Sequence, residues 1–195
     1  INSMDYNNFD HPYPYSLYSL EDGTKCVRFV ENSCIVIMQN YFKDKNLFFN
    51  PVISIKELLP ILKNLKANYE FQFRDLINWI EEEYKNEIDL LEKIIKERYI
   101  DFYNLTQLFP IGQYVGVKFG ETITGAKITD AMFKNNVSGK DYFMIFFEKI
   151  NSDGLSLIRI QEQQTINFWK GLRKIDSFPI FPISKGDKIY HELVA

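Results

Sequence analysis

A short glycine-containing segment, GETITGAK at residues 120–127, is the part of the chain closest to a phosphate-binding loop. Such a loop needs two glycines separated by four residues, then at once Lys and Ser or Thr, so that the lysine reaches the phosphates and the hydroxyl reaches magnesium. Here Ala126 precedes Lys127, and Ile128 stands where the hydroxyl is needed. The spacing therefore predicts a β-turn within a hairpin and no nucleotide site.

Histidine and cysteine are too few to suggest nucleophilic or metal chemistry. His11 and His191 lie near opposite ends of the chain, so a catalytic triad or a zinc site would have to recruit a terminal residue. Cys26 and Cys34 could form one disulfide across a hairpin, but two cysteines are no disulfide framework, and we expect reduced thiols. The acidic run 81–83 is typical of a solvated helix face. A pair of carboxylates that meets only in space would leave no signature in the sequence. We expect no metal, no cofactor and no catalysis by this chain itself.

One cluster combines an aromatic ring with cations, at Trp169, Lys170, Arg173 and Lys174. Such a cluster can stack bases or hold phosphates. The alternative is an amphipathic edge whose lysines extend their charged ends into water. The net charge of −3 argues against a general nucleic-acid binder, which needs a basic face. Nucleic acid therefore stays an alternative partner that the sequence does not favour.

The composition is that of a folded chain with a substantial core. Of 195 residues, 46% are hydrophobic and 16% aromatic, which is enough apolar material to bury. No segment approaches the roughly 18 apolar residues of a membrane helix, and the first residues lack a basic segment followed by an apolar run. We expect a soluble, intracellular protein without a membrane partner.

The elements that would position these residues begin with an extended arm at 1–23. Two β-like runs follow, CVRFV at 26–30 and CIVIM at 34–38, and their spacing predicts a hairpin. Ser54 with Glu57 three residues later predicts a helix start with a capping box. Pro60 should kink that helix or delay its start. A second amphipathic helix is predicted from Phe71 to Arg98.

Asp101 is a suitable cap for a short helix at 102–109. Its apolar residues Leu105, Leu108 and Phe109 should pack the helix end into a sheet. Pro110 and Gly112 should end the helix, and Gly112 and Gly171 should permit tight backbone turns.

After residue 112 the pattern is that of strands. The run YFMIFFEKI at 142–150 is typical of a buried strand, and LSLIRI at 155–160 should be its hairpin partner across a turn at 151–154. A polar stretch, QEQQ, follows at 161–164. Pro179 and Pro182 allow only an edge strand or an extended tail. The fold class is therefore α+β, with a helical segment at about 54–109 packed against a small antiparallel barrel or curled sheet at 112–183. We expect a single domain from 24 to 195.

Several phrases, taken in order, resemble an uncharacterised domain of large AAA-family ATPases, best known from fungal proteins, where it lies upstream of the ATPase core. They are CIVIMQNY (34–41), VISIKELLPILKNL (52–65), the long helix, YIDFYNLTQLFPIGQYV (99–115), DYFMIFFEKINSDG (141–154) and GLRKIDSFPIFPI (171–183). The match covers roughly residues 34–187. This chain departs from the family at or beside Gln107, where the family usually has Trp, and it lacks the ATPase core.

The resemblance implies a non-catalytic accessory N-terminal domain that binds a protein partner or substrate for a motor downstream, with no catalytic residues of its own. Oligomers would then form through the missing core. Two other classes stay open from the residues alone: a nucleic-acid-binding small-barrel module that uses Trp169 and Arg173, and a structural or assembly protein, for example of a virus.

Overall fold

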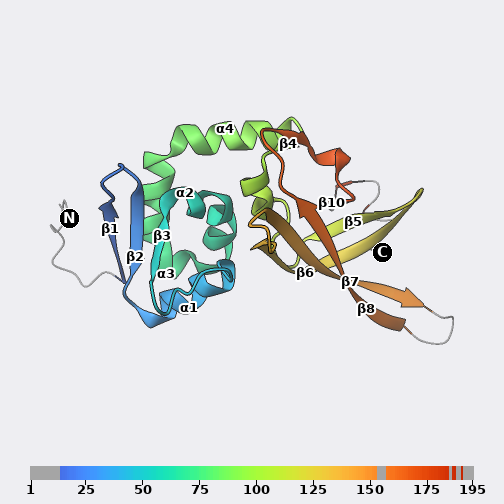
Figure 1. The fold of residues 1–195 in the computed structure, drawn as a ribbon, viewed down its shortest axis with the longest axis horizontal. Helices are drawn as coiled ribbons and strands as arrows, with labels where there is room; N and C mark the ends of the chain where they lie inside the picture. Colours follow the sequence, from blue (N-terminus) through green and yellow to red (C-terminus); the bar gives the residue numbers. More distant parts are fainter. Residues whose placement is uncertain (1–13, 153–156, 185, 188–189, 191–195) are drawn as a thin grey trace. The chain divides into compact units, whose positions relative to one another are not determined.

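A computed structural model describes residues 14–152, 157–184, 186–187 and 190 of the chain (Figure 1). The chain forms two compact units, Ile1–Leu90 and Leu91–Ala195, each with its own hydrophobic cluster. From the sequence we expect one domain from residue 24 with an arm before it, and that division into domains stays a prediction. The arm's residues 1–13 lie outside the described residues, whereas residues 14–23 belong to the first unit. The division follows from two sets of apolar side chains that are buried separately.

The first unit opens with a three-stranded antiparallel sheet in the order β1-β2-β3. The strands are β1 Tyr15–Ser19, β2 Lys25–Phe29 and β3 Val52–Ser54. An N-terminal hairpin is therefore present as predicted, but the partner of β2 is β1, from within the expected arm, and not residues 34–38. Asp22 and Gly23 make the turn, because Asp22 Oδ1 accepts from the Thr24 amide at 2.9 Å and Gly23 has a φ of 81°. An Asp-Gly pair is a strong hairpin signal, so this turn was readable in the sequence.

The predicted strand at 34–38 is wrong, because these residues lie in helix α1, Asn32–Tyr41. The run of β-branched residues favours a strand by propensity alone. In the helix, however, Cys34 and Met38 come one turn apart on the same face, and both are almost fully buried. Burial in the core therefore overrides local propensity.

The helical region begins where the capping signal predicts. The Ser54 amide donates to Glu57 Oε2 at 3.2 Å, and α2 spans Ile55–Leu58. Pro60 lies in a 3-10 turn, η1 Leu59–Ile61, so the main helix starts late, as expected of a proline at this place.

Helix α3 then runs over Leu62–Glu83, and α4 over Lys85–Lys96. The single helix predicted from about Phe71 to Arg98 is therefore wrong in its start and in its continuity. Helical residues begin at Leu62, and α3 is kinked by non-helical φ/ψ at Tyr69 and Phe73. Tyr84 has φ −110° and ψ 24°, which interrupts the helix, although no Pro or Gly marks this point. The Tyr84 and Trp79 rings meet edge to face at 6.3 Å, and Lys25 Nζ lies 5.6 Å from the Trp79 ring centre. These ring and cation contacts hold Trp79 and Tyr84 at the point where the helix is interrupted.

The core of the first unit combines residues from its sheet and its helices. Its buried members are Val27, Phe29, Cys34, Met38, Leu47, Ile53, Ile55, Leu58, Ile61, Leu62, Leu65, Phe73, Leu76, Ile77 and Ile80.

The second unit begins with β4 Tyr99–Ile100, which pairs with β9 Arg173–Lys174, and with the 3-10 helix η2 Phe102–Gln107. Asp101 caps η2 as predicted, since its Oδ1 accepts from the Tyr103 amide at 3.1 Å. Leu105, Leu108 and Phe109 are at most 5% exposed, which confirms their predicted burial. Gly112 and Gly171 have φ values of 87° and 82°, so both occupy the left-handed region that favours glycine.

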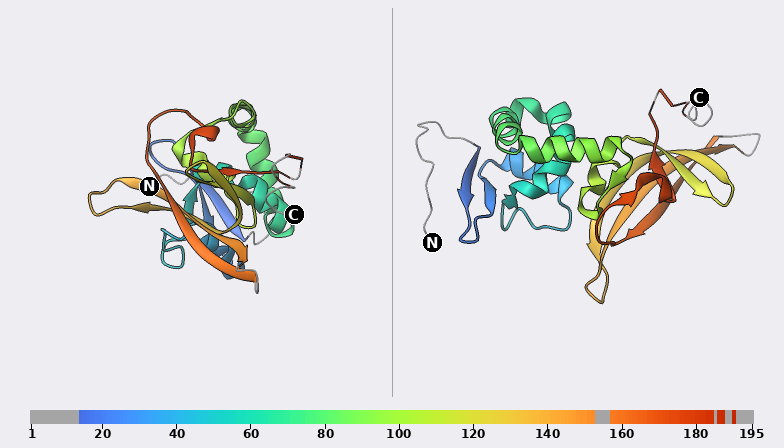
Figure 2. Two further views of the ribbon diagram at one scale, coloured as in Figure 1. Left: turned by 90° about the vertical axis from the view of Figure 1, so that its right-hand side faces the viewer. Right: turned by 90° about the horizontal axis from the view of Figure 1, so that it is seen from above.

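A five-stranded antiparallel sheet in the order β10-β5-β6-β7-β8 makes up most of the second unit (Figures 1 and 2). The strands are β5 Tyr114–Phe119, β6 Thr122–Asn135, β7 Asp141–Ser152, β8 Leu157–Asn167 and β10 Ile180–Pro182, with a 3-10 turn, η3 Ile175–Ser177, before β10. The sheet is curled, and among the described residues β8 and β10 do not pair to close it into a barrel. The candidate phosphate loop at 120–127 contributes the turn between β5 and β6, as predicted.

The core of the second unit joins η2 to this sheet. Its buried members are Ile100, Phe102, Leu105, Leu108, Phe109, Val115, Val117, Ala126, Ile128, Phe143, Ile145, Phe147, Ile166, Ile175, Phe178 and Ile180.

The two edges of the sheet differ. As Pro179 and Pro182 predict, β10 is a short edge strand, and its Phe181 ring lies over Gly116, where a Cβ would come within 2.6 Å of it. At the other edge, β8 continues through QEQQ at 161–164, which the sequence analysis assigns to a polar stretch after the strand. An edge strand needs few apolar side chains, so the polar residues 161–164 do not indicate in the sequence that the strand continues. The turn predicted at 151–154 lies partly outside the described residues.

Both thiols should react slowly in the folded chain. Cys26 and Cys34 are free, and each is at most 4% exposed. Burial raises the pKa of both thiols and so disfavours the reactive thiolate. With a thiol-specific disulfide reagent at neutral pH, we expect modification at least about tenfold slower than in guanidinium chloride, because reaction requires local opening. Two thiols titrating as fast as free cysteine, or a bridged pair in mass spectrometry after alkylation, would contradict this expectation.

Candidate functional site

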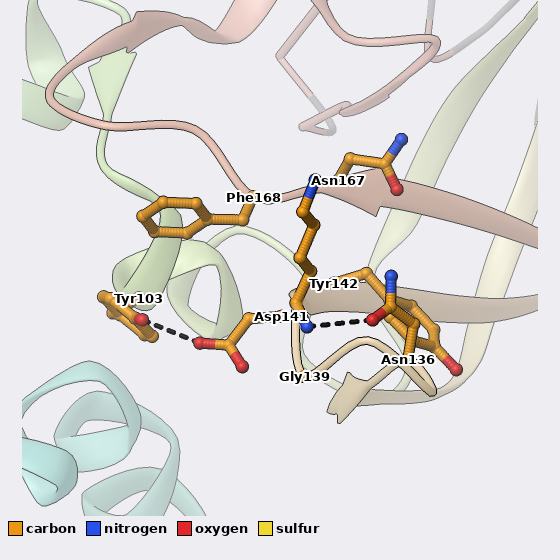
Figure 3. A pocket seen from close by; sticks show the side chains of 8 residues that line it. Tyr103, Asn136, Gly139, Asp141, Tyr142, Asn167 and Phe168 are labelled. Atoms are coloured by element: carbon orange, nitrogen blue, oxygen red, sulfur yellow. Dashed lines mark hydrogen bonds between the residues drawn. The ribbon is translucent and has the colours of Figure 1, made fainter.

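A surface pocket of about 630 Å³ lies at one end of the sheet of the second unit (Figure 3). It is built by η2, the β6–β7 turn, the start of β7 and the end of β8. The residues that line it are Tyr103, Asn136, Gly139, Lys140, Asp141, Tyr142, Asn167 and Phe168. The pocket therefore combines aromatic rings with amide and charged groups.

A carboxylate with fixed orientation is the chemical centre of this pocket. The Tyr103 hydroxyl donates to Asp141 Oδ2 at 2.8 Å. With its amide nitrogen turned towards Asp141, Asn135 donates to Oδ1 at 2.7 Å. The bond to Asp141 raises the pKa of the Tyr103 hydroxyl, and partial burial adds to the effect. Since each carboxylate oxygen can accept a further bond, Asp141 remains an acceptor for a ligand.

The β6–β7 turn that holds Asp141 is organised by one side chain. Asn136 Oδ1 accepts from the backbone amides of Ser138 at 3.0 Å and Lys140 at 2.8 Å. The Gly139 amide donates to the Asn136 carbonyl at 2.9 Å, and Gly139 has a φ of 75°. This network follows from Asn and Gly in a turn, and it fixes the start of β7.

The aromatic side of the pocket rests on a buried ring. Phe102 is 1% exposed, and its ring meets those of Tyr103 and Phe168 edge to face, each with centres 5.3 Å apart. Tyr103 and Phe168 themselves stay 56% and 48% exposed. In the view of Figure 3 their rings lie on one side of Asp141, and Asn136 lies on the other. The accessible rings of Tyr103 and Phe168 thus lie beside the Asp141 carboxylate, whose orientation is fixed by hydrogen bonds.

The predicted basic cluster lies close to this pocket in sequence, but it is partly used for packing. The Trp169 ring meets those of Phe102 at 5.4 Å and Phe178 at 5.3 Å, and its Nε1 donates to the Gly171 carbonyl at 2.9 Å. The Arg173 guanidinium lies 5.7 Å from the Trp169 ring centre and 4.8 Å from that of Phe178. The structure thus brings Trp169 and Arg173 together.

Lys170 and Lys174 are exposed. That the four residues bind a ligand stays a prediction.

The other residues singled out in the sequence have structural places. Leu105, Leu108 and Phe109 belong to the core of the second unit, and Gly112 and Gly171 to turns. His11 and His191 lie outside the described residues. Among the residues that the structure describes, no group of three or more His, Cys, Asp or Glu could hold a metal ion, and no helix is long and apolar enough to cross a membrane.

Comparison with known proteins gives one finding. Residues 91–186 match the model of a family described as a domain of unknown function (DUF7025). The match begins at Leu91, the first residue of the second compact unit, so it covers most of that unit and all residues that line the pocket. No curated protein and no solved structure matches the chain.

Proposed function

We propose that this chain is a non-catalytic accessory domain of an AAA-family ATPase, and that its second unit binds a basic side chain within an extended segment of a protein partner. The observation that carries the binding part is the Asp141 carboxylate, held beside the exposed rings of Tyr103 and Phe168. An Arg or Lys side chain can lie on such rings and donate to the carboxylate at the same time.

The resemblance to the ATPase-associated domain supports the assignment to a motor. Two of the phrases that carry it, 99–115 and 141–154, supply Tyr103 and Asp141 to the pocket. The third late phrase, 171–183, follows Phe168 closely. All three fall within the range 91–186 that matches the domain of unknown function. Two of the phrases that carry the resemblance therefore contribute residues to the pocket.

The nucleic-acid alternative receives less support from the geometry. Single-strand binding needs accessible aromatic faces and a cationic groove. Trp169 packs on Phe102 and Phe178 and has Arg173 beside it, whereas the exposed rings, Tyr103 and Phe168, stand next to a carboxylate that would repel phosphate. A cationic peptide fits this arrangement better than a polyanion does.

Peptides that differ at one position test the binding part. We expect a short peptide with a central Arg to shift the backbone amide resonances of Asp141 and Phe168, and peptides with Gln or Glu there to shift them far less. Asp141→Asn should weaken binding of the Arg peptide about tenfold, the low end for a hydrogen bond between charged groups. Asp89→Asn, on the exposed face of α4, is the charge-matched control and should change nothing.

Equal binding of the three peptides would contradict the proposal, and preference for Glu would indicate that Lys140, which also lines the pocket, is the recognising group. The assignment to a motor is tested separately by the coding sequence that follows Ala195. A phosphate loop and an acidic magnesium motif there would support it. A gene that ends without them would contradict that part alone.

A further inference from the structure

β8 is the long edge strand of the second unit's sheet, and among the described residues it pairs with β7 alone. Edge strands expose backbone groups that pair with other chains, and proteins usually block them with proline, lysine or a bulge. The opposite edge, β10, is short, follows Pro179 and ends with Pro182. β8 spans Leu157–Asn167, carries neither Pro nor Lys, and pairs with β7 in one unbroken register. Within the described residues, the same sheet therefore has one edge restricted by proline and one edge, β8, that carries no such restriction.

The unpaired backbone groups of β8 can be identified from its register. The Phe168 amide donates to the Asp141 carbonyl of β7 at 3.2 Å. Because inward and outward groups alternate along an antiparallel strand, the even-numbered residues of β8 bond to β7. The backbone N–H and C=O groups of Gln161, Gln163 and Thr165 then face away from the sheet. Among the described residues, one side chain reaches this row: Gln164 Nε2 lies 3.3 Å from the Thr165 carbonyl.

From this edge we infer that a second copy of this chain pairs with β8 in antiparallel fashion, about a two-fold axis at Gln163. In that register Ile160 lies opposite Ile166, and Glu162 lies opposite Gln164. Ile160 is half-buried and Ile166 is 3% exposed, so this register sets two apolar side chains of the same sheet face opposite each other. Cross-strand apolar pairs and acid–amide pairs of this kind stabilise a ladder.

Charge disfavours one of the two neighbouring registers. A shift of the axis to Glu162 would place that carboxylate opposite its own copy, which is unfavourable. With the axis at Gln163, Arg159 lies opposite Asn167, and no like charges meet. Glu162 is already paired with Lys149 Nζ at 2.6 Å, so the new strand need not cover an isolated charge. An interface with this symmetry is isologous and closes as a dimer.

A charge exchange at the axis tests this pairing by sedimentation over about 1 µM to 1 mM chain, the range of weak to moderate association. The wild-type chain should reach twice its 23.1 kDa mass. Gln163→Lys and Gln163→Glu each place like charges opposite one another and should raise the dissociation constant about fivefold. An equimolar mixture of the two should dimerise at least as well as wild type. Gln72→Lys, an exposed position of α3, is the matched control and should leave the dimer unchanged.

Three results would overturn the inference. They are a wild-type chain that stays monomeric throughout, a dimer that both Gln163 variants leave intact, and a mixture that associates no better than either variant. Circular dichroism of each variant checks that it is folded. The dimer does not depend on the pocket. A chain that stays monomeric but still binds the Arg peptide would contradict the dimer and leave the proposed peptide binding intact.

Discussion

Phe109→Ala is expected to lower the free energy of unfolding of the second unit by about 3–5 kcal/mol, the usual cost of deleting a buried phenylalanine ring. Phe109 is 1% exposed, and its ring centre lies 6.2 Å from that of Phe143 on β7. The residue directly follows η2 and its cap, so the cavity would open where this helix end meets the sheet. A domain has about 5–15 kcal/mol in total, so the loss should expose much of the unit.

Hydrogen exchange followed by mass spectrometry is the suitable measurement, because two compact units need not unfold as one transition. Exchange in β5, β6 and β7 should accelerate strongly in the variant. Phe119→Ala on β5 is the matched control: its ring is 45% exposed, and it should cost about 1 kcal/mol or less. Equal, small losses at both positions would mean that Phe109 is accessible in solution and would make it a docking residue.

Features decided by neighbouring residues could be predicted from the sequence. The capping pair Ser54 and Glu57, the cap at Asp101 and the restriction of β10 by its prolines all depend on side chains within three residues of one another. Such interactions are almost the same in any fold that contains the segment.

Features decided by tertiary partners could not be predicted in this way. The run at 34–38 has the composition of a strand, yet it is helical because Cys34 and Met38 find the core from one helix face. QEQQ at 161–164 is a strand because β7 supplies a ladder, although its side chains give no apolar signal. In both places the deciding contact comes from another element, which local pattern does not contain.

The candidate site illustrates the same limit. Tyr103 and Asp141 are 38 residues apart, and Phe168 comes later still, so no spacing in the sequence connects them. The sequence did indicate the neighbouring cluster at Trp169 and Arg173, because those residues lie within four positions of each other and include a rare type. In the sequence, Asp141 has the features of an ordinary turn residue. Only the packing of η2 against the sheet shows that Tyr103 and Phe168 lie beside it.

In the first unit, the largest expected loss of stability comes from Phe73→Ala, again about 3–5 kcal/mol. Phe73 is fully buried, and its ring meets that of Phe29 edge to face with centres 6.1 Å apart. It also has φ −123° and ψ 15°, so α3 departs from helical geometry at the residue that joins it to the sheet. Removing the ring should therefore open a cavity where the kinked part of α3 contacts the sheet.

Phe71→Ala gives a control two residues away on the same helix. Its ring is 85% exposed, so the substitution removes the same atoms at almost no cost in burial. We expect amide exchange across α3 and β2 to accelerate strongly in Phe73→Ala and to stay close to wild type in Phe71→Ala. Similar exchange in the two variants would show that α3 does not depend on this ring. In that case its anchor would have to lie in the buried residues that follow, Leu76, Ile77 and Ile80.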